Sequence, residues 1–389
     1  MAEWFPKRLD EIVEFNPRET IKKGVIAKKV AMDKLQPFCR DITEFELEPF
    51  SGGTKFRNGD TIMARITPCL ENGKTAKVNI LDDGEVGFGS TEYIVFRARE
   101  GVDADFVYYL ISSPLVREPA IKSMVGSSGR QRVQTDVVQG ITVMVPTLEE
   151  QEDIAGILKL LDDKIALNRK INDNLEQQVQ LLYDNFITTV DEIPIAISEV
   201  IDVRDGTHDS PKPLEEGYPL VTSKYLLPFG VDVISPNKIS ESDYNKVNER
   251  SKVNTNDILF SMIGTVGLVS LIIEEEINFA IKNVGLFKTS NCPQYKYYLL
   301  CYLKSKNTTQ HIEKHLAGST QKYISLTELR KRPITIPNAV DINKFNDLVT
   351  PLFTLIIENV KENKVLTTIR DSLLPKLISG ELSVSNIDF

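Results

Sequence analysis

The chain has 389 residues, 41% of them hydrophobic and 26% charged, a composition typical of a soluble globular protein with two or three domains. Its formal net charge of −9 comes from 46 basic and 55 acidic residues, which disfavours nucleic-acid binding over the whole surface. A net five of these negative charges lie within residues 148–190, so the other parts are nearly neutral and can carry local basic faces.

Three further observations indicate the compartment. The opening residues MAEWFPKRLDEIVEF lack the apolar core of a signal peptide, and the longest uncharged run, residues 258–273, is too short to span a bilayer. The four cysteines have spacings that match neither a zinc site nor a dense disulfide framework. We therefore expect a cytoplasmic protein with no membrane partner.

Residues 1–147 are predicted to form a first globular domain of mixed α/β (α+β) structure. Short β-branched runs, TIMARIT, EYIVFRA and ITVMVP, alternate with Gly, Asn and Asp turns. Residues 103–124 have the pattern of helices.

Two segments of this domain carry side chains suited to nucleic acid. Arg57, Arg65 and Lys74 surround a predicted hairpin, and the loop GSSGRQR (126–132) combines bases, an amide and hydroxyls without an acid. Small residues let backbone N–H groups approach phosphate, and Arg with Gln can read base edges. A flexible polar loop is the alternative interpretation. The predicted DNA contacts of the loop are Ser127, Ser128, Arg130, Gln131 and Arg132.

Residues 148–190 are predicted to form a long helix. Its apolar residues recur at alternating spacings of three and four, which is the pattern of a heptad seam. Thr147 is a candidate N-cap, with Glu150 three residues further on. The predicted seam consists of Leu158, Leu161, Ile165, Asn168, Asn172, Leu175, Val179, Leu182 and Phe186.

Residues 191–338 are predicted to form a second globular domain with its own polar loops. GTHDSPK (206–212) and VTSKYL (221–226) are rich in donors and acceptors, and GSTQKY (318–323) follows a helix as GSSGRQR does. These segments suit an interface with hydrogen-bonding specificity, although a solvated face is the alternative. The predicted DNA contacts are Thr207, His208, Ser210, Lys212, Ser223, Lys224, Ser319, Thr320, Gln321, Lys322 and Tyr323.

Residues 339–389 are predicted to form a second long helix that repeats the first. KIALNRKINDNL (164–175) returns as LIIENVKENKVL (355–366) at an offset of 191 residues, and residues 132–146 align without gaps with 323–337. The chain therefore contains two copies of one unit, each a globular part followed by a helix. The second seam consists of Val349, Leu352, Ile356, Asn359, Asn363, Leu366, Arg370, Leu373 and Leu377.

Both seams carry two successive asparagines. If the helices pack antiparallel, Asn168 and Asn172 can face Asn359 and Asn363 and set the register, although polar positions tolerated near solvent would give the same pattern. Arg370 stands where the first seam has Val179. We expect Arg370 either to lay its stem on the seam or to pair with an acid of a partner subunit.

Enzyme motifs are incomplete. ENGKTA (71–76) lacks the first glycine of a phosphate-binding loop, GFGSTE (87–92) lacks the third glycine of a dinucleotide fingerprint, and Glu313 is misplaced for a metalloprotease base between His311 and His315. We predict no catalytic residue and no metal site, and interpret the chain as a binding or scaffolding protein.

The chain resembles the specificity subunits of type I restriction–modification enzymes. The resemblance rests on the tandem unit, on residues 146–187 that end the first unit, and on IRDSLLPKLISGEL (369–382). DGTHDSPK with GYPLVTSK, and ARITPCLENGK with GFGSTEY, also resemble target-recognition domains of that family. The resemblance covers essentially the whole chain.

The resemblance implies two target-recognition domains, each reading one half of a split, asymmetric sequence in double-stranded DNA. Two helices would form an antiparallel coiled coil that fixes the gap, so inserting heptads near residues 176–186 should change the gap. Two methyltransferase subunits would bind, carrying S-adenosylmethionine for adenine methylation, and a restriction or motor subunit would use ATP and magnesium. This chain itself would hold no cofactor and perform no catalysis.

Three alternatives stay open at the level of sequence. The first is the specificity subunit of a related single-motor or bifunctional system. The second is a coiled-coil scaffold with two protein-binding domains and no DNA role. The third is a self-contained enzyme, which methylation or cleavage by the purified chain alone would support.

Overall fold

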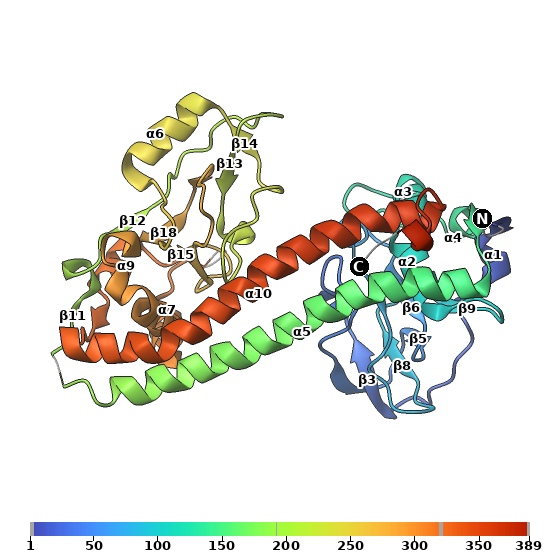
Figure 1. The fold of residues 1–389 in the computed structure, drawn as a ribbon, viewed down its shortest axis with the longest axis horizontal. Helices are drawn as coiled ribbons and strands as arrows, with labels where there is room; N and C mark the ends of the chain where they lie inside the picture. Colours follow the sequence, from blue (N-terminus) through green and yellow to red (C-terminus); the bar gives the residue numbers. More distant parts are fainter. Residues whose placement is uncertain (1–3, 192, 319–321, 387–389) are drawn as a thin grey trace. The chain divides into compact units, whose positions relative to one another are not determined.

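The computed structural model describes residues 4–191, 193–318 and 322–386, and it divides into two compact units (Figure 1). The first unit comprises residues 1–167 and 362–389, and the second comprises residues 168–361. Two long helices, α5 (Leu148–Ile187) and α10 (Ala339–Ser379), each contribute one end to each unit. The predicted fold class, mixed helix and sheet with two long helices, is confirmed.

The globular part of the first unit is built around two four-stranded sheets within residues 4–147. One has the order β2-β9-β6-β7 and is antiparallel, and the other has the order β4-β3-β8-β5 with β3 and β8 parallel. A separate pair, β1 and β10, is antiparallel. The elements are β1 (Phe5–Arg8), α1 (Leu9–Ile12), β2 (Val13–Phe15), β3 (Ile26–Val30), β4 (Glu46–Pro49), β5 (Thr54–Phe56), β6 (Thr61–Ala64), β7 (Thr75–Lys77), β8 (Gly87–Gly89), β9 (Tyr93–Ala98), α2 (Ala104–Ser112), α3 (Pro114–Lys122), α4 (Thr135–Gln139) and β10 (Thr142–Val145).

The second unit repeats this topology in its described residues. Its main sheet has the order β12-β18-β15-β16, its smaller sheet has the order β14-β13-β17 with β13 and β17 parallel, and β11 pairs with β19. The elements are β11 (Ile195–Ala196), β12 (Val203–Asp205), β13 (Tyr218–Val221), β14 (Lys238–Ile239), α6 (Glu241–Ser251), β15 (Ile258–Ser261), β16 (Val269–Leu271), β17 (Ala280–Ile281), β18 (Val284–Phe287), α7 (Lys296–Lys304), α8 (Lys306–His315), α9 (Leu326–Lys331) and β19 (Pro333–Ile334).

The long helices belong to the hydrophobic core of each unit. In the first unit, Leu158 and Leu377 are fully buried in the same cluster as Tyr109 of α2. In the second unit, Val179 and Phe345 are buried in one cluster with Tyr298 of α7. Burial of such side chains stabilises a fold by about 1.5–3 kcal/mol each, so the helices are integral to both domains.

The helix ends run antiparallel, and asparagines mark their register. In the second unit, Asn359 Nδ2 donates to Asn172 Oδ1 at 2.8 Å, and Asn172 Nδ2 donates to the Ile356 carbonyl at 3.2 Å. In the first unit, Asn363 Nδ2 donates to the Ile165 carbonyl at 3.4 Å. At the offset of 191 residues, Asn172 aligns with Asn363 and Ile165 aligns with Ile356. The two hydrogen bonds from asparagine to isoleucine carbonyl are therefore equivalent, with the roles of α5 and α10 exchanged. Asn168 is buried one turn before Asn172.

Arg370 differs from the expectation that it pairs with an acid of a partner subunit. Its guanidinium Nη1 lies 2.7 Å from Asp162 Oδ1 on α5, and Nη2 lies 2.7 Å from Asp371 Oδ1. The side chain is buried between the helix ends of the first unit. Arg370 therefore pairs within its own chain. The sequence did not predict this partner, because Asp162 lies just outside the apolar seam.

Across the described residues, no helix is both long enough and apolar enough to cross a membrane.

Candidate nucleic-acid interface

The loop of residues 126–132 is held in the first unit by the end of β6. Arg132 forms bridges with Val125 and with Ile66, which follows β6. The Gln131 N–H donates to Thr67 Oγ1 at 2.8 Å, and the Thr67 N–H donates to the Gln131 carbonyl at 3.0 Å. These bonds fix the base of the loop and leave its tip exposed. The exposed residues of the tip are Ser127, Ser128 and Arg130.

The second unit holds its matching loop in the same way. Tyr323 forms bridges with Ala317 and with Ile263, which follows β15, and the Gly264 N–H donates to the Lys322 carbonyl at 3.2 Å. Lys322 and Tyr323 are exposed. Tyr323 aligns with Arg132 at the offset of 191 residues, and it makes the equivalent backbone bridges. The predicted contacts Ser319, Thr320 and Gln321 lie outside the described residues.

A cavity of about 490 Å³ opens beside this loop in the second unit. Ser223 and Lys224, in the short helical turn Ser223–Tyr225 after β13, lie on one side of it. Among the described residues that line it there is one cation and no carboxylate. Such a lining suits an anionic or hydrogen-bonding ligand. The lining residues are Thr222, Ser223, Lys224, Ile263, Gly264, Thr265, Leu268 and Asn283.

The loop of residues 206–212 is joined to this cavity through Asn283. The His208 ring lies with Nδ1 2.7 Å from Asn283 Oδ1 and Nε2 3.0 Å from Asp205 Oδ2. The Asn283 N–H donates to the Thr207 carbonyl at 3.1 Å. A Cβ on Gly206 would lie 2.3 Å from the Ile281 carbonyl oxygen, so only glycine allows this close approach.

The rest of this loop borders a second cavity of about 420 Å³. Thr207 and Ser210 line it together with Lys246 and Arg250 of α6. Ser210 Oγ also accepts a hydrogen bond from Lys282 Nζ. Lys212 is exposed at the end of the loop.

Sequence reasoning missed Lys282 and Asn283, although both bind predicted residues. Asn283 has a positive φ of 54°, a conformation that asparagine tolerates better than most residues. The Lys-Asn pair between the apolar runs FAI and VGLF is a turn signal that could have found the position.

Most predicted basic residues of the first unit have partners within that unit. Arg57 Nε lies 2.6 Å from Glu19 Oε1, and Lys74 Nζ donates to the Met32 carbonyl at 2.7 Å. Arg65 Nη2 makes a long hydrogen bond of 3.4 Å to the Val133 carbonyl. These side chains stabilise the hairpin region, which the sequence pattern did not reveal because the partners are distant in the chain.

Arg132 also has an acidic partner, although its own loop contains none. Its guanidinium contacts both oxygens of Glu92 at 2.7–3.0 Å. These hydrogen bonds lower the pKa of the Glu92 carboxyl. Among the described residues, Arg130 has no ion-pair partner, so it is the predicted cation of this loop that is available to an external anion.

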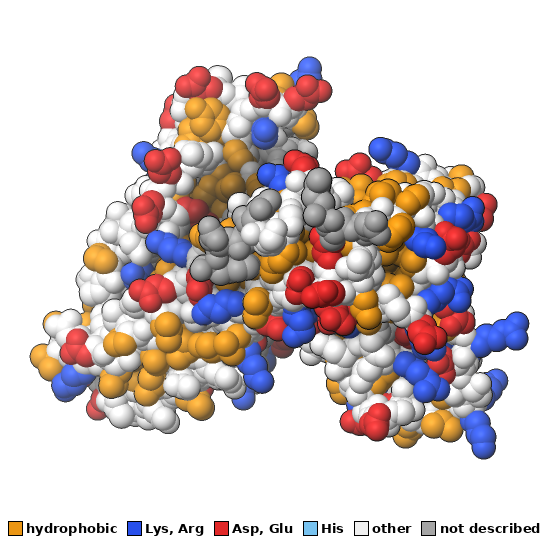
Figure 2. Space-filling view, turned by 45° about the vertical axis from the view of Figure 1, so that its right-hand side comes forward, with side chains coloured by type: hydrophobic (Ala, Val, Ile, Leu, Met, Phe, Trp, Pro, Cys, Tyr) orange, Lys and Arg blue, Asp and Glu red, His pale blue; other side chains and the backbone are white. Residues whose placement is uncertain are grey.

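Basic and acidic side chains are mixed over the face of the molecule in Figure 2, as the nearly neutral domain charges require. Local groups must therefore supply any attraction to phosphate.

The described residues contain no group of three or more His, Cys, Asp or Glu side chains placed to hold a metal ion.

Residues 1–177 and 195–366 each match the family described as the type I restriction modification DNA specificity domain. The chain belongs to this family. Each match runs through one globular part and most of the following long helix, so the repeat found in the sequence is a repeat of the family domain.

Similar proteins of known name are type I specificity (S) subunits as well. The chain is 27% identical over 324 residues to the type I restriction enzyme MjaIX specificity subunit of Methanocaldococcus jannaschii, covering 74% of this chain and 71% of that protein. It is 24% identical over 412 residues to the HindI specificity subunit of Haemophilus influenzae, covering 84% and 87%. A solved type I restriction–modification S subunit from M. genitalium is similar in fold, with a TM-score of 0.52, 17% identity and coverage of 97% and 96%.

Membership in this type I specificity family supports DNA target recognition as the role of the two globular parts. Specificity subunits act in complexes with DNA and other subunits and are not themselves catalytic. The cavity and loops described above are the features of this chain that best suit such a role.

Proposed function

We propose that this chain reads a split, asymmetric target in double-stranded DNA and brings two methyltransferase subunits to it for adenine methylation. Each globular part would read one half of the target. S-adenosylmethionine would be held by the methyltransferase, and ATP with Mg²⁺ by a restriction or motor subunit, with no cofactor on this chain. The family membership carries the proposal, and three features of the molecule support it.

The first feature is the polar surface around the loop of residues 322–323. The described residues that line the cavity with Ser223 and Lys224 present hydroxyls, an amide and a cation, without a carboxylate. Hydroxyls and cations position phosphate, and amides with aromatic rings read bases. Lys322 and Tyr323 lie exposed beside it.

The second feature is that the two loops share a backbone attachment but differ in side chains. Arg132 and Tyr323 form equivalent bridges to Ile66 and Ile263. A dimer of identical readers requires palindromic half-sites. Two copies with different reading side chains in one chain can instead recognise two unrelated half-sites.

The third feature is a row of exposed apolar side chains on each long helix. Leu160, Leu167 and Leu181 on α5 occupy one heptad position, although Asn174 interrupts the row. Exposed apolar residues at heptad spacing are suited to packing against a further helix, as a methyltransferase subunit could supply. A second row on α10, at a different position of the repeat, consists of the exposed residues Leu348, Leu355 and Ile369.

The decisive experiment is to produce this chain with its methyltransferase subunit in a methylation-free host and to map modified adenines across the genome. We expect a split motif with a fixed gap that is absent when this chain is omitted. A stable complex that methylates no motif would contradict the proposal and favour a scaffold without a DNA role.

A pair of variants tests the cavity in the same assay. Lys224→Ala removes the cation from the lining and should reduce methylation of the target strongly. Lys306→Ala removes an exposed cation from α8, away from the cavity lining, and should leave methylation unchanged. Equal effects of the two variants would contradict the assignment of the cavity to DNA.

A further inference from the structure

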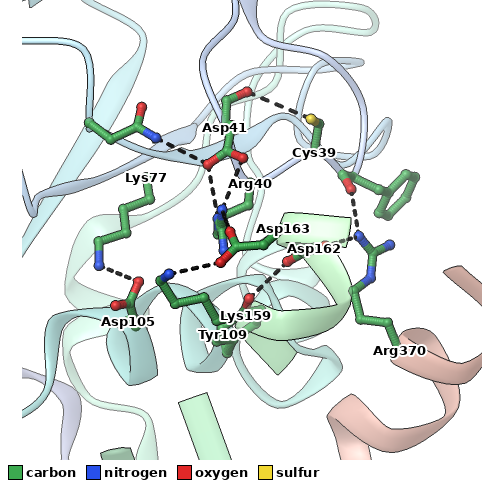
Figure 3. A network of polar contacts seen from close by, with 12 residues as sticks. Cys39, Arg40, Asp41, Lys77, Asp105, Tyr109, Lys159, Asp162, Asp163 and Arg370 are labelled. Carbon is green, nitrogen blue, oxygen red and sulfur yellow. Dashed lines mark hydrogen bonds and ion pairs between the residues drawn. The ribbon is translucent and has the colours of Figure 1, made fainter. Parts of the chain in front are cut away.

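The first unit contains a buried ion pair between the two long helices (Figure 3). Arg370 Nη1 of α10 lies 2.7 Å from Asp162 Oδ1 of α5, and the two side chains are only 10% and 5% exposed. The Tyr109 hydroxyl donates to Asp162 Oδ2 at 2.8 Å. Burial and the neighbouring Asp162 charge raise the pKa of Tyr109, so the hydroxyl keeps the proton that it donates. Arg370 also donates to Asp371 and to the Phe38 carbonyl.

The equivalent positions of the second unit are apolar. At the offset of 191 residues, Arg370 corresponds to Val179 and Asp162 corresponds to Phe353. Val179 and Phe353 are both 2% exposed and line the same small cavity. The Tyr297 ring stacks on Phe353 at a centroid distance of 4.3 Å. The two repeats therefore share their asparagines but differ in this contact, which is ionic in one unit and apolar in the other.

We propose that the Asp162–Arg370 pair makes α5 and α10 select each other and reject the same helix of a second copy of this chain. Because the helices are repeats of one pattern, α5 of a second copy could replace α10, and α10 of a second copy could replace α5. The matched asparagines permit all three pairings, so they do not discriminate between them.

The ion pair does discriminate, because either replacement separates the two charges. In a pairing of α5 with α5, Asp162 would face Val179 of the second copy. In a pairing of α10 with α10, Arg370 would face Phe353 of the second copy. Only α5 with α10 matches charge with charge and apolar residue with apolar residue.

A neighbouring cation cannot take the place of Arg370. Arg40 lies near Asp162 but already contacts Asp41 Oδ1 at 2.9 Å and Asp163 Oδ1 at 2.5 Å. Figure 3 shows Arg40 directed at these two carboxylates and Asp162 directed at Tyr109 and Arg370. Since removing one partner of a buried ion pair is strongly unfavourable, pairing with a second copy should be weaker by on the order of 100-fold or more.

The experiment cuts the folded full-length chain between its repeats. A protease site inserted after Val190, in the exposed segment that follows α5, allows cleavage into two fragments that the paired helices hold together. Native mass spectrometry then reports which fragments pair after incubation at micromolar concentration. We expect complexes of one first fragment with one second fragment, without pairs of like fragments.

The test variant is Asp162→Phe with Arg370→Val, which gives the first unit the apolar contact of the second. Pairs of like fragments should now appear beside the unlike pair. Arg370→Val alone should allow pairs of the second fragment only, because the first fragment keeps its buried Asp162.

The control is Lys164→Ala with Glu362→Ala, which removes an exposed ion pair of the same helix ends and should keep the strict one-to-one pairing. The proposal is overturned if the unmodified fragments exchange into like pairs. It is also overturned if the Asp162→Phe, Arg370→Val variant, folded by circular dichroism, keeps strict one-to-one pairing.

Discussion

Asp60 and Asp257 lie at matching places in the two repeats and are both buried at the start of a central strand. Asp60 accepts hydrogen bonds from Arg97 and from the Arg57 N–H. Asp257 Oδ2 accepts from Lys288 Nζ at 2.5 Å and from the Asn254 N–H at 2.7 Å. The repetition of these aspartates in the sequence therefore reflects a structural ion pair in each domain.

Removing one of these carboxylates should destabilise the protein strongly. Asp257→Ala leaves Lys288 buried without its charged partner, and we expect a loss of about 3–5 kcal/mol in the free energy of unfolding. Asp202→Ala removes the exposed partner of Arg204 and should cost less than about 1 kcal/mol. Urea denaturation of the two variants measures both values, and a similar loss for each would contradict this explanation.

Gly206 should be required for the position of the loop of residues 206–212. Gly206→Ala places a methyl group against the Ile281 carbonyl, and an overpacking cost of about 1–3 kcal/mol would displace the loop. We expect roughly tenfold weaker methylation of the target in the co-production assay. Gly156→Ala on α5, where nothing lies within 4 Å of the new Cβ, is the control and should stabilise by about 0.5–1 kcal/mol.

At the scale of elements, the long helices were the most predictable part of the chain. Described seam residues such as Ile165, Val179 and Ile356 are buried, because a heptad pattern on a helix directly encodes the buried face. Two buried positions outside the predicted seam were missed: Tyr183 and Phe345 contact each other and also Tyr298 of the globular part. Periodicity identifies that a face is buried but not what it contacts.

The asparagine contact should behave as a coupled pair. Asn172→Leu leaves Asn359 without its acceptor and should cost about 1–3 kcal/mol of the free energy of unfolding. Asn172→Leu combined with Asn359→Leu replaces both polar groups and should recover most of that loss. A double-mutant cycle measures the coupling, and additive effects of the two substitutions would show that the asparagines act independently.

At the scale of the whole molecule, the sequence predicted two repeated α/β domains and their order along the chain. It did not predict the strand order, because pairs such as β2 with β9 and β3 with β8 join segments that are distant in the chain. The alignment of the two loops agrees with the equivalent backbone bridges of Arg132 and Tyr323, whereas the DNA contacts of both loops stay predictions. Which cations have internal partners depends on contacts such as Glu92 with Arg132, which no local pattern encodes.

The structure changes where a length insertion should be made. Residues 176–186 include Val179 and Tyr183, which are buried in the core of the second unit, so an insertion there would disrupt that core. Seven residues added to both helices where the units divide, after Leu167 and after Lys361, would keep each core intact.

This paired insertion lengthens each helix by about 10 Å, so we expect the gap to grow by about three base pairs with both half-sites unchanged. The genome-wide map of methylated adenines measures the gap. Insertion in α5 alone should abolish activity, and an unchanged gap in an active paired variant would contradict the idea that helix length sets the spacing.

The make-up of the two units has a consequence for synthesis on the ribosome. The second unit is one continuous stretch, residues 168–361, whereas the core of the first unit needs Leu377 and Ile378 from the last helix. Domains usually fold in the order in which they are made. Here the first unit must wait with its apolar surface uncovered until nearly the whole chain has emerged, so the domain that is translated second can be the first to finish folding.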